Sequence, residues 1–236
     1  MTKRALKVQN TVWIWAVVVA DAVTLAGFAF PAVADQMASW LASAHLAGAS
    51  IAPVIVLLLT SILPTALKEA LVFWRVRDVL PGHRAFSVYA QKDPRIDLAR
   101  LRTAAADFPA AARDQNSLWY RLYRQVEADP GVAQAHRHFL LFRDLTALSL
   151  LLTIVAPLVL YVLGASATAA WLAVALFGAQ YLASALAGRF RGVRFVCNVL
   201  ALHGASSAAN PGHSVRKRAT AASSDSAAAG RGRRRA

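Results

Sequence analysis

Four long runs of apolar residues divide this chain. They occupy residues 12–34, 46–66, 145–163 and 167–187, and each is about the length needed to cross a bilayer core as a helix. Between the second and third runs the apolar residues recur at helical spacing among polar ones, which is typical of amphipathic helices. The pattern predicts an all-α integral membrane protein with four transmembrane helices and a small helical domain between spans 2 and 3.

The basic residues predict the orientation of these spans. All 26 Lys and Arg residues lie before the first run, between the second and third runs, or after the fourth, and the connecting segments 35–45 and 164–166 carry none. Lys and Arg are enriched in the loops that stay in the cytoplasm. We therefore predict a multi-pass protein of the cell membrane, inner or plasma membrane, with both termini and the large loop in the cytoplasm.

Composition agrees with a membrane protein, because 57% of the residues are hydrophobic and only 16% are charged. The formal net charge of +14 suggests nucleic acid at first sight. However, the basic residues flank the spans, so orientation and attraction to anionic lipids of the inner leaflet account for them. Membrane lipids are the expected partners, and nucleic acid is disfavoured.

The first run resembles a signal peptide in one respect. Basic residues precede it, and it ends in Ala32-Val33-Ala34, which is similar to a signal-peptidase site. The run is longer than a signal sequence needs, and Trp13 and Trp15 are placed as interfacial anchors. We predict a retained span. The N-terminal unit, residues 1–66, then holds spans 1 and 2.

Asp21 lies near the middle of the first run, where a carboxylate is costly. It must be protonated or hydrogen-bonded, and its candidate partners are the uncharged polar residues of the other spans: Thr60, Ser61, Thr153, Gln180 and Tyr181. Two interpretations stay open. Asp21 either handles a proton or cation in a pathway, or joins two helices through a hydrogen bond, which is the interpretation we favour.

The segment 67–144 is predicted to form the cytoplasmic helical domain. Apolar spacing after the second span extends that helix to Pro81-Gly82. Asp93-Pro94 and Asp129-Pro130 each combine an N-capping carboxylate with a proline at the first helical position, so helices are expected over 94–106 and from Pro130 unbroken into the third span. Spans 3 and 4 make up the unit 145–187.

A helix with the sequence SLWYRLYRQVEA offers a candidate interaction face: Trp119, Tyr123, Arg121 and Arg124. The two aromatic rings and two guanidinium groups could stack a base and hold a phosphate. Trp119 and Tyr123 share a face with Leu122, however, which favours a core stripe. Arg143 and Asp144 form a candidate membrane-edge pair, interpreted as snorkelling side chains rather than a latch onto a neighbouring helix.

No cofactor or metal site and no catalytic motif is evident. His136 and His138, two residues apart on a helix, point to nearly opposite sides and are interpreted as surface residues. A single cysteine, Cys197, rules out an intramolecular disulfide. Absence of motifs lowers the expectation of an enzyme without excluding one.

After span 4, residues 188–204 are predicted to form an interfacial amphipathic helix. Residues 205–236, rich in Ala, Ser and Arg, are predicted to be a disordered basic tail that contacts anionic lipid. Its two basic clusters face the lipid: Arg216, Lys217, Arg218, Arg233, Arg234 and Arg235.

From this architecture we expect a non-enzymatic membrane protein whose cytoplasmic domain binds a ligand or partner and couples it to the membrane helices. It would act as a sensor, effector or scaffold. In one form of this hypothesis it assembles into an oligomer that alters the permeability of the membrane. The partner would be a second copy, a cytoplasmic protein or a small molecule. Two alternatives stay open: a small ion or proton channel or transporter that uses Asp21, and a membrane-tethered enzyme or nucleotide-binding module that uses the loop 81–130.

Overall fold

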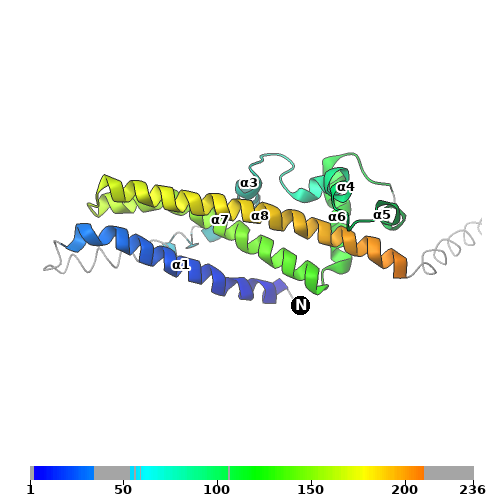
Figure 1. Ribbon diagram of the computed structural model, residues 1–236, viewed down its shortest axis with the longest axis horizontal. Coiled ribbons are helices and arrows are strands. Elements are labelled where there is room, and N and C mark those ends of the chain that lie inside the picture. Colours follow the sequence, from blue (N-terminus) through cyan, green and yellow to red (C-terminus); the bar gives the residue numbers. More distant parts are fainter. Residues whose placement is uncertain (1–2, 35–53, 56, 59, 106, 210–236) are drawn as a thin grey trace, which may run out of the picture.

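The computed structural model describes residues 3–34, 54–105 except 56 and 59, and 107–209, and this part of the chain contains helices and no strands (Figure 1). The helices that follow one another along the chain are α1 (Lys3–Ala34), α3 (Thr65–Phe73), η1 (Pro81–Arg84), η2 (Ala85–Tyr89), α4 (Ala90–Lys92), α5 (Leu98–Ala105), α6 (Ala112–Val126), α7 (Pro130–Val162) and α8 (Ala167–Ala209). The predicted all-helical class is confirmed for these residues.

Among the described residues, three helices are long and apolar enough to cross a membrane. The qualifying segments are Asn10–Phe30, Pro130–Val162 and Ala167–Ala205. The chain is therefore a membrane-embedded protein by the length and composition of its helices. Residues 46–53, 56 and 59 of the predicted span 46–66 lie outside the described residues, so four spans stay a prediction. The tail predicted from residue 205 begins later than expected, because α8 continues to Ala209, and the rest of it, from residue 210 onward, lies outside the described residues.

Helices α7 and α8 form an antiparallel hairpin that organises the molecule, and α1 packs along α7 (Figure 1). The hairpin turns at Gly164, whose φ of +74° suits a residue without a side chain. Leu148, Leu152 and Phe177 are fully buried between the three helices. We call the packed apolar parts of α1, α7 and α8 the membrane bundle.

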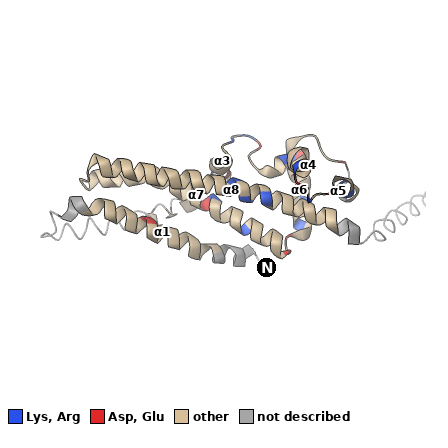
Figure 2. Ribbon diagram, viewed as in Figure 1, with Lys and Arg blue, Asp and Glu red and all other residues tan. Residues whose placement is uncertain are grey.

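The hairpin is longer than a bilayer requires. Helix α8 has 43 residues and α7 has 33, which correspond to about 65 Å and about 50 Å at 1.5 Å per residue. A hydrocarbon core is about 30 Å thick. The remaining length carries the short helices η1 to α6, which we call the loop domain, and most described Lys and Arg residues lie at that end (Figure 2).

The helix after the second apolar run ends earlier than predicted. It was expected to continue to Pro81, but α3 ends at Phe73, and Trp74 adopts a left-handed conformation with φ 53°. The guanidinium of Arg189 donates hydrogen bonds to the carbonyls of Val72 (2.8 Å) and Phe73 (2.6 Å). A side chain from α8 thus replaces the next helical turn, and no second long stalk forms.

The two predicted helix starts have different outcomes. Helix α7 runs unbroken from Pro130 to Val162, and Asp129 accepts hydrogen bonds from the first-turn amides, as predicted. The start at Pro94 is wrong, because α5 begins at Leu98. The Asp93 carboxylate is instead held by the guanidinium of Arg95 (2.6 Å).

The segment 188–204 is not a separate interfacial helix, because it is the continuation of α8. Its apolar residues Val196, Val199 and Leu200 are almost completely buried against the loop domain. Cys197 is buried beside them. From Val193 onward the apolar residues of this segment therefore pack on protein, whereas Phe190 near its start is 72% exposed.

Candidate functional site

A cluster of four rings lies where the loop domain meets α7 and α8. Phe195 of α8 is at its centre, with ring centroids 5.2 Å from Trp119 and 5.2 Å from Tyr123, both of α6. The imidazole of His136 on α7 stacks on Phe195 at 4.7 Å. Edge-to-face and stacked pairs of this kind add to the stability gained from burial. The cluster joins three helices.

Hydrogen bonds fix the orientation of two of these rings. The Tyr123 hydroxyl and Nδ1 of His136 are 3.1 Å apart. The Trp119 indole N–H donates to the carbonyl of Val196 at 3.4 Å. Because Trp and Tyr carry one polar group each, pairing that group allows the rest of the ring to be buried. The loop domain is thus fixed to both arms of the hairpin.

A cavity of about 230 Å³ opens beside this cluster. Its walls come from α3, η1, α6, α7 and α8, and most of the lining side chains are aromatic or aliphatic. Two charged residues, Glu69 and Arg143, also line it. An apolar enclosure with a few converging polar groups is the usual form of a small-molecule site. We call this hollow the aromatic cavity; it is lined by Glu69, Leu80, Pro81, Gly82, Trp119, Tyr120, Tyr123, His136, Phe139, Leu140, Arg143, Gly192, Phe195 and Val196.

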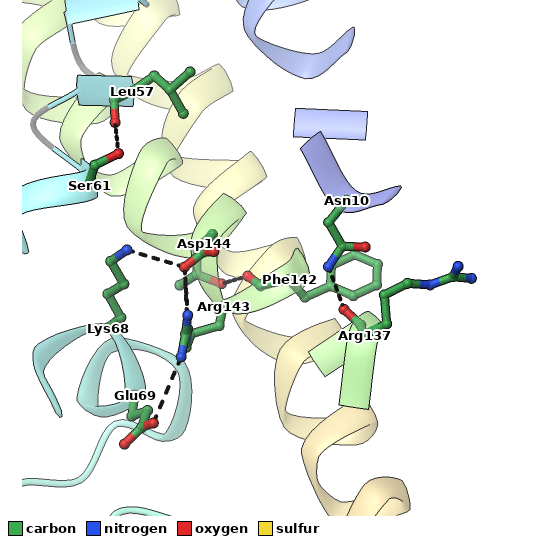
Figure 3. Close-up of polar contacts among 10 residues, drawn as sticks. Asn10, Leu57, Ser61, Lys68, Glu69, Arg137, Phe142, Arg143 and Asp144 are labelled. Carbon is green, nitrogen blue, oxygen red and sulfur yellow. Dashed lines mark hydrogen bonds and ion pairs between the residues drawn. The ribbon is translucent and has the colours of Figure 1, made fainter. Parts of the chain in front are cut away.

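The charged residues of the cavity belong to an ion-pair network between α3 and α7 (Figure 3). The Asp144 carboxylate accepts from the ammonium of Lys68 at 3.2 Å and from the guanidinium of Arg143 at 3.1 Å. Arg143 also lies 4.0 Å from the carboxylate of Glu69. Burial raises the pKa of Glu69 above its usual value, and the charge of Arg143 opposes that shift.

In the structure Arg143 and Asp144 belong to this network between two helices, whereas snorkelling side chains would extend away from the protein. The side chain of Arg143 is only 15% exposed and that of Asp144 29%, and both point toward α3 rather than away from the protein (Figure 3). They latch α7 onto the neighbouring helix. Sequence spacing could not identify Lys68 as the partner, because 76 positions separate it from Asp144.

Asp21 forms a hydrogen bond with an uncharged polar side chain of another helix. It is 5% exposed on α1, and its Oδ2 accepts a hydrogen bond of 3.3 Å from the side-chain amide of Gln180 on α8. Closer to the loop domain, the amide of Asn10 donates to the backbone carbonyl of Arg137 on α7 at 2.8 Å (Figure 3). Both hydrogen bonds attach α1 to the hairpin.

The four residues of the candidate interaction face do not form one surface. Trp119 and Tyr123 are 8% and 6% exposed within the core of the loop domain, as the core-stripe interpretation expected. Arg121 and Arg124 are exposed, and Arg124 pairs with Glu127 at 3.0 Å. The rings and guanidinium groups therefore do not combine to stack a base and hold its phosphate.

The structure also places residues that sequence reasoning missed. His136 is a partly buried member of the ring cluster rather than a surface residue. Gly188 and Gly192 let α3 approach α8: a Cβ on Gly192 would lie 2.8 Å from Cζ of Phe73, and one on Gly188 would lie 3.0 Å from Val72. Their four-residue spacing was the available signal.

Within the described residues, no group of three or more His, Cys, Asp or Glu side chains is arranged to hold a metal ion. Comparison of the chain with models of protein families, with curated proteins and with solved structures gave no match. The aromatic cavity and the ion pairs beside it are thus the features from which a function has to be inferred. Their chemistry suits recognition of an apolar body with a polar or charged end.

Proposed function

We propose that this chain is a non-enzymatic membrane sensor or effector whose loop domain binds a small molecule and couples its binding to the membrane bundle. The observation that carries the proposal is the position of the aromatic cavity. It is lined by residues of α7 and α8 that belong to the same continuous helices as the apolar segments of the bundle. A ligand in the cavity would contact both arms of the hairpin.

Coupling requires that a ligand favour one arrangement of the helices over another. The cavity lies between α3, which is short and anchored by side-chain contacts, and the long hairpin. A ligand that displaces Glu69 or Arg143 would change the ion pairs that hold α3 on α7. The resulting movement of α3 is the two-state element in this proposal.

The two alternative functions have less support in the geometry. A conduction pathway through Asp21 needs an accessible carboxylate, whereas Asp21 is buried and bonded to Gln180. A nucleotide site on the candidate interaction face needs rings and guanidinium groups that face one ligand, whereas Trp119 and Tyr123 are buried and Arg121 and Arg124 are exposed. We therefore favour ligand sensing over transport or catalysis.

The proposal includes the orientation expected from the basic residues, with the loop domain and both termini in the cytoplasm and four spans in the cell membrane. Reporter insertions test it directly. A topology reporter near Gln91 or after Ala236 should read cytoplasmic, and one near Ala44 should read external. A cytoplasmic reading near Ala44 would contradict the four-span arrangement.

Filling the cavity tests the coupling without a known ligand. Leu140, on α7, lines the cavity, and Leu140→Trp would occupy part of its volume. Leu158→Trp makes the same change on α7 at a side chain that is 61% exposed and faces away from the core. Spin labels on Val19→Cys and Leu176→Cys, in a Cys197→Ala background, report the separation of α1 and α8 in lipid nanodiscs by pulsed electron paramagnetic resonance.

We expect Leu140→Trp to shift the distribution of distances between the two labels and Leu158→Trp to leave it unchanged. The unlabelled variants should keep their helix content, as measured by circular dichroism. If both variants give the distribution of the parent protein, a change in the cavity does not reach the bundle. Coupling through the cavity would then be rejected.

A further inference from the structure

A second hollow, separate from the aromatic cavity, lies where α3 ends against α8. Its volume is about 450 Å³. Four arginines line it: Arg75, Arg84, Arg189 and Arg194. Among the described residues that line it there is no carboxylate. We call it the arginine pocket.

The charges of these arginines are not neutralised within the described part of the chain. None of the four guanidinium groups forms an ion pair there. Arg189 and Arg84 donate to backbone carbonyls, and the Nε of Arg84 is buried with no hydrogen-bond partner. Arg75 and Arg189 lie near enough to repel each other. An anion in the pocket would remove this repulsion and supply an acceptor.

The pocket also has the surroundings of a membrane interface. Arg189 and Arg194 lie within the first two helical turns after the apolar stretch 167–187 of α8. Phe190, which lines the pocket, is 72% exposed, and Trp74, stacked 3.6 Å beneath the guanidinium of Arg189, is 48% exposed. Exposed aromatic rings beside basic residues are typical of the zone where lipid headgroups meet the acyl chains.

We infer that the arginine pocket binds the phosphate of an anionic lipid headgroup in the leaflet next to the loop domain. Guanidinium groups bind phosphate oxygens through paired hydrogen bonds, and the Tyr89 side chain in the same wall offers a hydroxyl donor. The exposed ring of Phe190 would lie against the acyl chains of the same lipid. Inorganic phosphate has no apolar part that could contact that ring.

Arg75 lies just after the C-terminal end of α3, and Arg189 lies on α8. A lipid phosphate bound by both would therefore hold the end of α3 against α8. The inference concerns a different set of side chains from the aromatic cavity. On α8 the cavity uses Gly192 and Phe195, whereas the pocket uses Phe190 and Arg194. It rests on the membrane placement of α8 and not on the proposed cavity ligand.

Titration of the full-length protein in nonionic detergent micelles tests the inference. The probes are dihexanoylphosphatidylglycerol, dihexanoylphosphatidylcholine and inorganic phosphate, with binding followed by native mass spectrometry and ³¹P nuclear magnetic resonance. We expect saturable binding of the anionic lipid at one equivalent, at least fivefold weaker binding of the zwitterionic lipid, and weak competition by inorganic phosphate.

Arg75→Gln and Arg194→Gln should each weaken binding of the anionic lipid about fivefold, because one basic side chain near an anionic headgroup contributes that much. Both side chains are exposed, and neither forms an ion pair with another described residue, so these variants should keep the parent's helix content. Arg77→Gln, on the same connection but outside the pocket, removes the same charge and should bind like the parent.

Three results would overturn the inference. Equal affinities for the two lipids would mean that the headgroup charge is not recognised. Binding of inorganic phosphate as tightly as the anionic lipid would assign the pocket to a soluble anion. Affinities unchanged in Arg75→Gln and Arg194→Gln, or lowered equally by Arg77→Gln, would place the lipid elsewhere. None of these results bears on the Leu140→Trp test of the aromatic cavity.

Discussion

Replacing Asp144 by Asn tests whether α3 is held on α7 by charge. Asp144 is the carboxylate shared by Lys68 and Arg143, whose side chains are only 11% and 15% exposed. The amide keeps the size of the side chain but removes its negative charge. Two partly buried cations are then left with Glu69 as their remaining acidic neighbour, 4.0 Å from Arg143.

The magnitude follows from the burial of the three side chains. An exposed ion pair contributes at most about 1 kcal/mol, and removing one partner of a fully buried pair costs about 3 to 5 kcal/mol. Asp144 is 29% exposed and faces two cations, so its loss falls between these limits. We expect Asp144→Asn to lower the free energy of unfolding by about 2 kcal/mol, or roughly 30-fold in the unfolding equilibrium.

Unfolding in mixed micelles of nonionic detergent and dodecyl sulfate, followed by tryptophan fluorescence, measures this free energy. Lys68→Met and the double variant complete a cycle, whose coupling energy we expect to be about 1 kcal/mol. The control is Asp97→Asn, which removes a carboxylate from an exposed pair, 47% and 56% exposed, and should cost less than about 0.5 kcal/mol. If Asp144→Asn is as stable as this control, the charge of Asp144 does not hold α3 on α7, and the reasoning from burial is refuted.

Phe195→Ala should lower the free energy of unfolding by about 3 to 5 kcal/mol, because it removes the ring on which the aromatic cluster is built, and chemical unfolding measures the loss. The hydrogen bond from Arg95 holds the pKa of Asp93 at about 2, below its ordinary value of 3.8. Asp93 therefore stabilises the fold above about pH 4 and loses that contribution as the pH falls toward 2. Unfolding measured across this range should become less pH-dependent in Asp93→Asn, and an unchanged pH dependence would contradict the assignment. Asp21→Leu should cost about 1 kcal/mol through the lost bond to Gln180, whereas Asp21→Asn should leave proton flux into reconstituted vesicles unchanged; altered flux would favour the conduction alternative.

The sequence predicted well those helices that are determined by interactions of nearby residues or by their own length and hydropathy. A bilayer selects spans by length and hydropathy alone, so the runs that became α1, α7 and α8 were visible without any tertiary information. The N-cap at Asp129 depends on amides two and three residues away, and it was predicted for the same reason. The apolar stripe of α6 likewise lies within a single helix.

Contacts between distant segments decided the rest. Helix α3 ends at Phe73 because the Phe73 carbonyl accepts a hydrogen bond from Arg189, which is 116 positions away. No glycine or proline at that point of the sequence indicates the end. His136 became a cluster residue only because α6 and α8 bring Tyr123 and Phe195 against it. The amphipathic segment after residue 187 has the same apolar stripe whether lipid or protein covers it, and only the tertiary structure shows that the loop domain does. The pattern of apolar residues indicates which side chains are buried away from water, whereas the tertiary structure determines whether protein or lipid contacts them.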